Sequence, residues 1–166
     1  RIRWDKPIDE VQIIALDRPR HHSLFKEINT LGAQLHTLSD GDIAAALWAA
    51  RPEGNYDMLL GIGAAPEGVI TATAIRGIGG VFEGRLVFRS DAEEARAANM
   101  IDDDLTRLWS ARDLCQSDDA VFVASGVCDG YLPGVKINQD GTIGTFAEMI
   151  DVASGKITRH DRIHNQ

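Results

Sequence analysis

One stretch of the chain combines a short apolar run, a glycine turn and a proline that opens a new apolar segment. The run from Met58 to Leu60 is typical of a buried strand, and Gly61 and Gly63 form a turn directly after it. Pro66 fits the first position of a helix, where its missing N–H group costs nothing. Glu67 follows it directly. The stretch therefore predicts a strand, a turn and a helix whose N-terminus carries a carboxylate.

The same order of strand, loop and helix occurs twice before this stretch. Strand-length runs at residues 11–16 and 34–38 are each followed by an apolar segment with helical spacing, the first carried by Leu24, Ile28 and Leu31. Three such units in succession predict an α/β fold with a mainly parallel sheet and right-handed crossovers. The loops after parallel strands meet at one edge of the sheet, where such folds bind ligands.

The second half of the chain is less regular. Residues 81–88 alternate in polarity as a strand does, residues 90–114 are typical of one or two helices, and residues 120–124 predict another buried strand. Residues 134–163 contain short β segments separated by glycine-containing turns, which predicts hairpins. We therefore expect a C-terminal part rich in β-hairpins.

Composition and charge narrow the possible functions. The chain of 166 residues has a net charge of -8, which argues against a nucleic-acid-binding face. Its longest apolar run, Ile43 to Ala50, is too short to span a membrane. Two cysteines without CxxC spacing are too few for a disulfide framework, so a reducing compartment is the default. We therefore expect a cytoplasmic protein that binds neither nucleic acid nor membranes.

The glycine turn admits two interpretations of its acidic residue. Gly61 and Gly63 resemble the start of a dinucleotide-binding fingerprint, but Pro66 occupies the third glycine position and Glu67 places a negative charge where a pyrophosphate would lie. No GK[ST] sequence follows, which excludes a P-loop. Glu67 either stabilises the helix dipole, by about 0.3–1 kcal/mol, or binds a divalent cation that joins it to a phosphate at the same helix end.

The first loop carries two arginines around a proline. Arg18, Pro19 and Arg20 form a fork that suits bidentate contacts with a phosphate. The alternative is that both arginines are solvated and pair with nearby acids. His21 and His22 could assist in binding a phosphate at this loop, although surface histidines are the commoner case.

The second loop carries two acids around a glycine. Asp40 and Asp42, which flank Gly41, could accept hydrogen bonds from sugar hydroxyls or hold a cation. Either acid could equally cap the helix that follows. Both interpretations stay open from the local sequence.

Together, the three loops resemble the class II fructose-1,6-bisphosphatases, including cyanobacterial forms that also act on sedoheptulose 1,7-bisphosphate. The matching motifs are LDRPRH at residues 16–21, SDGD at 39–42 and LLGIGAAPEGVI at 59–70. The resemblance implies a layered α/β/α sugar-phosphatase fold. It also implies metal-dependent hydrolysis of fructose 1,6-bisphosphate to fructose 6-phosphate and phosphate, as in gluconeogenesis, glycerol metabolism or the Calvin cycle.

The resemblance assigns roles to the three loops. It implies that residues 18–20 hold a substrate phosphate, that residues 40–42 contact the sugar, and that Ala64 approaches the substrate through its backbone. Glu67 would ligate one of the catalytic Mg²⁺ or Mn²⁺ ions. The substrate-binding positions are Arg18, Pro19, Arg20, Asp40, Gly41, Asp42 and Ala64.

In this family the other metal-binding carboxylates, and the groups that position the attacking water, come from an N-terminal half that is not among these residues. The resemblance therefore implies that residues 1–166 correspond to the C-terminal half and hold no catalytic residue of their own. Activity would need the N-terminal half, from the same precursor or a partner chain, in a homo-oligomer. The alternative is a non-catalytic half-protein that binds sugar phosphates or has a regulatory role.

Overall fold

A small parallel sheet forms the N-terminal part of the computed structural model, which describes residues 5–165. Its strands are β1 (Gln12–Leu16), β2 (Gln34–Leu38) and β3 (Met58–Leu59), in the order β2-β1-β3. β1 pairs with β2 along its whole length and with β3 at Ile13 and Ile14. Because β1 is central and covered on both faces, its sequence is a nearly continuous apolar run and does not alternate with polar residues. The predicted α/β class is confirmed.

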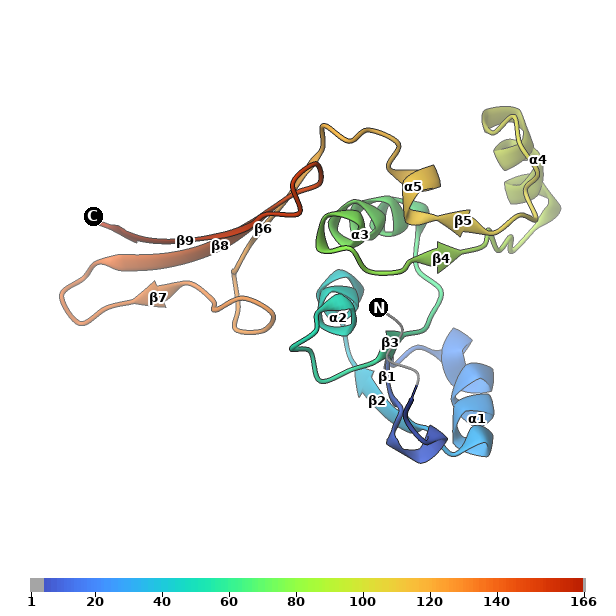
Figure 1. The fold of residues 1–166 in the computed structure, drawn as a ribbon, viewed down its shortest axis with the longest axis horizontal. Helices are drawn as coiled ribbons and strands as arrows, with labels where there is room; N and C mark the ends of the chain where they lie inside the picture. Colours follow the sequence, from blue (N-terminus) through green and yellow to red (C-terminus); the bar gives the residue numbers. More distant parts are fainter. Residues whose placement is uncertain (1–4, 166) are drawn as a thin grey trace.

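Helices α1 (His22–Leu31) and α2 (Asp42–Ala50) lie on opposite sides of β1 (Figure 1). Ile28 of α1 packs against Ile13, which forms the core on that side. The helix ends at Gly32, whose φ of 84° is a left-handed conformation that glycine adopts without strain. Of the three residues that were expected at helical spacing, Leu24 and Ile28 join the core, while Leu31 is 64% exposed.

A second core joins α2 to α3 (Ala65–Ile78) and to the C-terminal sheet. Leu47 and Ala74 pack there with Phe122 and Ile150. The sheet is antiparallel and has four strands, in which β8 pairs with all three others. The predicted hairpin-rich C-terminal part is thereby confirmed, and among residues 5–165 parallel pairing is confined to β1, β2 and β3. The four strands are β6 (Val121–Ser125), β7 (Lys136–Ile137), β8 (Ile143–Asp151) and β9 (Ile157–His164).

The segment between α3 and β6 consists of short elements. Residues 81–88 were expected to form one strand, but only β4 (Glu83–Gly84) does so, paired with β5 (Trp109–Ser110). Helix α4 (Asp91–Met100) begins after Ser90, whose hydroxyl accepts a hydrogen bond from Glu93 N and so caps the helix. The remaining elements are α5 (Ala111–Leu114) and the 3-10 turns η1 (Ile8–Glu10) and η2 (Pro19–His21).

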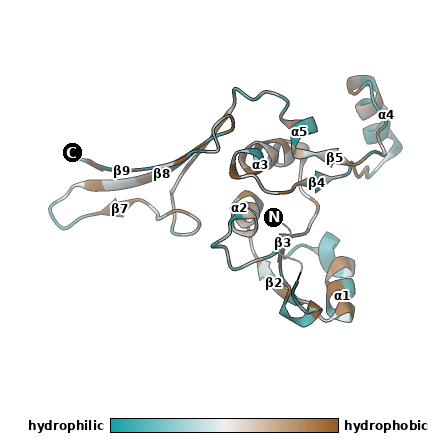
Figure 2. Ribbon diagram, in the orientation of Figure 1, coloured by the Kyte–Doolittle hydropathy of each residue, from teal (hydrophilic) through white to brown (hydrophobic). Residues whose placement is uncertain are grey.

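The β8–β9 hairpin extends away from the helices, and only part of the C-terminal sheet packs on them (Figure 1). Alternation along β6 places Phe122 in the core, while Val121 and Val123 are exposed on the other face. Apolar residues are also distributed along β8 (Figure 2). The face that carries Val121 and Val123 therefore exposes apolar side chains to water.

Among residues 5–165, no helix combines the length and apolar character that crossing a membrane requires.

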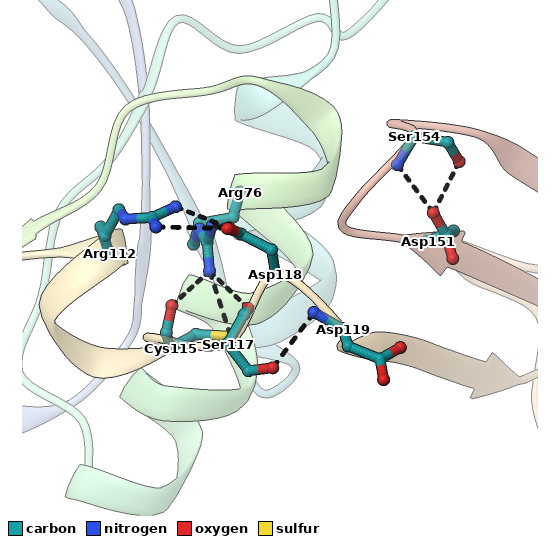
Figure 3. A network of polar contacts seen from close by, with 8 residues as sticks. All are labelled: Arg76, Arg112, Cys115, Ser117, Asp118, Asp119, Asp151 and Ser154. Atoms are coloured by element: carbon teal, nitrogen blue, oxygen red, sulfur yellow. Dashed lines mark hydrogen bonds and ion pairs between the residues drawn. The ribbon is translucent and has the colours of Figure 1, made fainter.

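A polar network fixes the segment that leads from α5 to β6 (Figure 3). Arg76 of α3 donates to the carbonyl oxygens of Cys115 and Ser117 and to the carboxylate of Asp118. Arg112 donates to the same carboxylate at 2.6 Å. Hydrogen bonds from Arg112 and then Arg76 lower the pKa of Asp118 to about 2. The chain that enters the C-terminal sheet is thus held against α3.

A buried carboxylate ties α2 to the C-terminal hairpin. Glu148 of β8 is fully buried, and its Oε1 accepts hydrogen bonds from Arg51 Nη2 and Tyr131 Oη, both at 2.6 Å. Its Oε2 accepts from Arg159 Nε at 3.1 Å. Burial, and then the bond to Glu148, raise the pKa of Tyr131. Since Arg51 caps the C-terminus of α2, this cluster joins the two parts of the molecule.

We predict that Glu148→Ala lowers the free energy of unfolding by about 3–5 kcal/mol, because it leaves the buried Arg51 guanidinium without its main counter-charge. Denaturant titration followed by circular dichroism measures the change. Glu53→Ala is the matched control, because Glu53 also pairs with Arg51, at 3.5 Å, but is solvent-exposed. Equal effects of the two substitutions would contradict the proposed importance of the buried contact.

Candidate functional site

The loops that follow β1, β2 and β3 meet at one edge of the parallel sheet. Asp17 N donates to Leu38 O at 2.7 Å, and Leu60 N donates to Ile14 O at 3.1 Å, so pairing continues to the ends of the strands. The three loops therefore begin side by side. This convergence was predicted from the alternation of strands and helices and is confirmed.

Arg18 links the first loop to the second. Its Nη1 donates to Ser39 O at 2.6 Å and to Asp17 O at 3.0 Å, and its Nη2 lies 3.6 Å from Asp40 Oδ1. The side chain of Asp40 is 90% exposed, so water screens this ion pair strongly. Part of the hydrogen-bonding capacity of Arg18 is thus satisfied within the protein.

Arg20 links the first loop to the third. Its Nε donates to Ile62 O at 2.8 Å. Among residues 5–165, the terminal nitrogens of Arg20 have no hydrogen-bond or ion-pair partner, so they are available for an anion at this edge. A guanidinium held through Nε and free at its two ends can contact a phosphate in a bidentate manner.

Asp42 lies beside the glycine turn. The cap of α2 is Gly41, with a left-handed φ of 93°, and neither acid of the loop caps the helix as expected, because the backbone of glycine occupies the cap position. Asp42 Oδ1 accepts from Ile43 N at 2.9 Å. A Cβ atom added to Gly63 would lie 3.2 Å from Asp42 Oδ2, so the second and third loops are in close contact.

The N-terminus of α3 is open to an anion. Ala64 is its cap residue, no side chain caps the helix, and Pro66 is in the second helical position, one residue later than predicted. Backbone N–H groups that lack partners at a helix N-terminus attract anions, and the helix dipole strengthens this attraction. The position of Ala64 therefore suits a backbone contact with a negatively charged ligand.

Glu67 has a carboxylate oxygen that suits a cation. Its Oε2 is buried and has no hydrogen-bond partner among the described residues. An acid that only offsets a helix dipole can keep both oxygens in water, whereas a buried acceptor without a donor costs about 1–3 kcal/mol. A divalent cation would satisfy this oxygen. Residues 5–165 contain no group of three or more His, Cys, Asp or Glu placed to hold a metal ion.

His21 is the site residue whose position the sequence did not indicate. It was expected at the surface or beside a phosphate, but it is only 2% exposed. Its Nδ1 lies 2.8 Å from Leu16 O, and its Nε2 accepts a hydrogen bond from Ile62 N at 2.8 Å. A Cβ atom at Gly61 would lie 3.1 Å from its Cε1, so the first glycine of the turn makes room for the imidazole. Gly61 was therefore the feature of the sequence that could have indicated a buried ring at His21.

We predict that Gly63→Ala displaces Asp42, because the added methyl group meets Asp42 Oδ2. Amide chemical shifts of residues 39–43 should change in a ¹H–¹⁵N NMR spectrum. Gly68→Ala is the control, because nothing lies within 4 Å of its added Cβ. An unchanged spectrum of residues 39–43 in Gly63→Ala would contradict the contact between the two loops.

The chain is similar in sequence to proteins of a known family. Residues 3–164 match the family model described as bacterial fructose-1,6-bisphosphatase, glpX-encoded. The chain is 37% identical to a D-fructose 1,6-bisphosphatase class 2/sedoheptulose 1,7-bisphosphatase of Prochlorococcus marinus strain MIT 9515, covering 83% of this chain and 46% of the relative. A protein of the same name from Prochlorococcus marinus strain MIT 9312 is also 37% identical, covering 82% and 45%. The chain thus spans about half the length of the curated relatives it matches.

Proposed function

The chain belongs to the family of bacterial, glpX-encoded fructose-1,6-bisphosphatases, and on this premise we propose that it is the substrate-binding half of a metal-dependent sugar bisphosphatase. The reaction proposed is hydrolysis of the 1-phosphate of fructose 1,6-bisphosphate to fructose 6-phosphate and phosphate. Sedoheptulose 1,7-bisphosphate is a second candidate substrate, because the names of the relatives include both activities.

The observation that carries this proposal is the buried Glu67 Oε2 without a hydrogen-bond donor, at an open helix N-terminus. A phosphate and a cation can both be satisfied there, the phosphate by backbone N–H groups and the cation by the carboxylate. Bound Mg²⁺ or Mn²⁺ would neutralise phosphoryl oxygens and activate water. Glu67 is the residue of this chain that would hold it.

The other residues in the loops after β1, β2 and β3 are proposed to bind and orient the substrate. Arg20 offers its terminal nitrogens to a phosphate, and Arg18 supports the same loop through Ser39 O. Asp40 and Asp42 accept hydrogen bonds from sugar hydroxyls, and Ala64 contributes its backbone. Fixing the sugar and its remote phosphate supplies binding energy that holds the reacting phosphate in place.

Catalysis is proposed to need a segment equivalent to the other half of the relatives, because one carboxylate cannot assemble a two-metal site. The exposed Val121 and Val123 on the outer face of the C-terminal sheet support such a partner, since contiguous apolar surface marks sites of association. A non-catalytic sugar-phosphate-binding module is the second candidate. It is favoured by the terminal nitrogens of Arg20, which can bind a phosphate without a metal.

We predict that the isolated 166-residue chain does not release phosphate from fructose 1,6-bisphosphate with Mn²⁺ present, and that adding the complementary half restores the activity. A colorimetric phosphate assay measures both. Turnover by the isolated chain would contradict the need for a partner. Binding of fructose 1,6-bisphosphate without turnover, even with the complementary half present, would favour the non-catalytic module.

We predict that Glu67→Gln in the complete enzyme lowers kcat/KM by about 100-fold or more, because even changes to residues that only hydrogen-bond a metal ligand cost about 10–100-fold. The Mn²⁺ concentration needed for half-maximal activity should rise. Glu94→Gln, a change of the same kind on the exposed face of α4, should leave both values unchanged. Unaltered metal dependence in Glu67→Gln would support the helix-dipole role instead.

A further inference from the structure

We propose that His21 is a positioning residue, which holds the glycine turn of residues 61–64 in register with the loop that carries Arg18 and Arg20. This inference rests on the proposed function of the sheet edge and extends it to a side chain that is not expected to touch the substrate. The turn leads directly into Ala64 and then Glu67, so its position determines where the proposed backbone contact and metal ligand lie.

The hydrogen bonds of His21 define its protonation state. Ile62 N can only donate, so the Nε2 atom that it meets at 2.8 Å must carry a lone pair. The imidazole proton is then on Nδ1, which donates to Leu16 O at 2.8 Å. His21 is thus a neutral ring in one tautomer, bonded at one end to β1 and at the other to the turn.

The first loop is hydrogen-bonded to the turn through Ile62. Ile62 donates its N–H group to His21 Nε2, and its carbonyl oxygen accepts from Arg20 Nε at 2.8 Å. Both polar backbone groups of Ile62 are therefore bonded to neighbouring side chains of the first loop. A shift of that loop is transmitted to the turn, and a shift of the turn is transmitted back.

Packing fixes the orientation of the imidazole. The ring of Phe25 meets it edge-on, with centroids 6.3 Å apart and planes inclined by 60°. The missing side chain of Gly61 also leaves space for the ring, because a Cβ atom there would lie 3.1 Å from His21 Cε1. Because His21 is only 2% exposed, the protein shields the imidazole ring from water.

Two substitutions separate positioning from general support of the fold. In His21→Gln the side-chain amide reaches the place of Nε2, so the bond to Ile62 can persist while Leu16 O loses its donor. In His21→Asn the amide lies near the place of Nδ1, so the bond to Leu16 O can persist while Ile62 N loses its acceptor. Each variant leaves one backbone group without its partner in the ring, Leu16 O in the first and Ile62 N in the second, so we expect both to lower the melting temperature.

We expect different activities from these two variants of the complete enzyme. His21→Asn should lower kcat/KM for fructose 1,6-bisphosphate by about 10–100-fold, because small displacements of a site have effects of that order. His21→Gln should stay within about threefold of the unmodified enzyme, because the turn keeps its bond. Glu94→Gln is the control, since Glu94 lies on the exposed face of α4, and it should change neither kcat/KM nor the melting temperature. Equal activity of the Gln and Asn variants, or lower activity of the Gln variant, would overturn the proposal.

Hydrogen exchange at the Ile62 amide tests the same contact without reference to activity. We expect the amide to be protected in the unmodified protein and in His21→Gln, and to exchange at least about tenfold faster in His21→Asn, because the acceptor is lost. Equal exchange in all three would overturn the proposal. If the unmodified enzyme releases no phosphate, the proposed function fails, and this exchange measurement still decides whether His21 holds the turn.

Discussion

Parallel pairing of β1 with both of its neighbours is the constraint on which the candidate site depends. β1 pairs with β2 from Gln12 to Leu16 and with β3 at Ile13 and Ile14, which aligns the carboxyl ends of all three strands. Since each loop leaves from the same edge, short contacts suffice to join them. Arg18 reaches Ser39 O, and Arg20 reaches Ile62 O. The site is therefore a consequence of strand order more than of any one loop.

The C-terminal sheet depends on a different interaction. The buried Glu148 receives hydrogen bonds from Arg51, Tyr131 and Arg159, which come from three different segments. A buried ion pair of this kind adds little net stability compared with apolar packing, but removing one member leaves a charge without compensation. Its effect is to fix how β8 lies against the end of α2. The long hairpin beyond this contact has little support from the helices (Figure 1).

Much of this architecture could be predicted from the sequence, because local patterns determine it. The strands at 12–16 and 34–38 have apolar or β-branched character, Gly32 ends α1, and Ser90 begins α4. The strand expected at residues 81–88 forms only at Glu83 and Gly84, because these are the two residues that pair with β5. The burial of His21 could not be predicted from the neighbouring residues. It depends on Gly61, forty residues later in the chain, which leaves space for the ring. Contacts across loops that are distant in sequence are not encoded in either loop alone.

Glu67 is proposed to contribute a metal ligand at the edge of the parallel sheet. Anomalous X-ray diffraction from crystals of the complete enzyme soaked in Mn²⁺ measures this directly. We predict an anomalous peak about 2.0–2.3 Å from Glu67 Oε2, a distance typical of carboxylate ligands of small divalent cations. An anomalous peak at another position, with Glu67 Oε2 hydrogen-bonded only to protein or water, would contradict this role of Glu67.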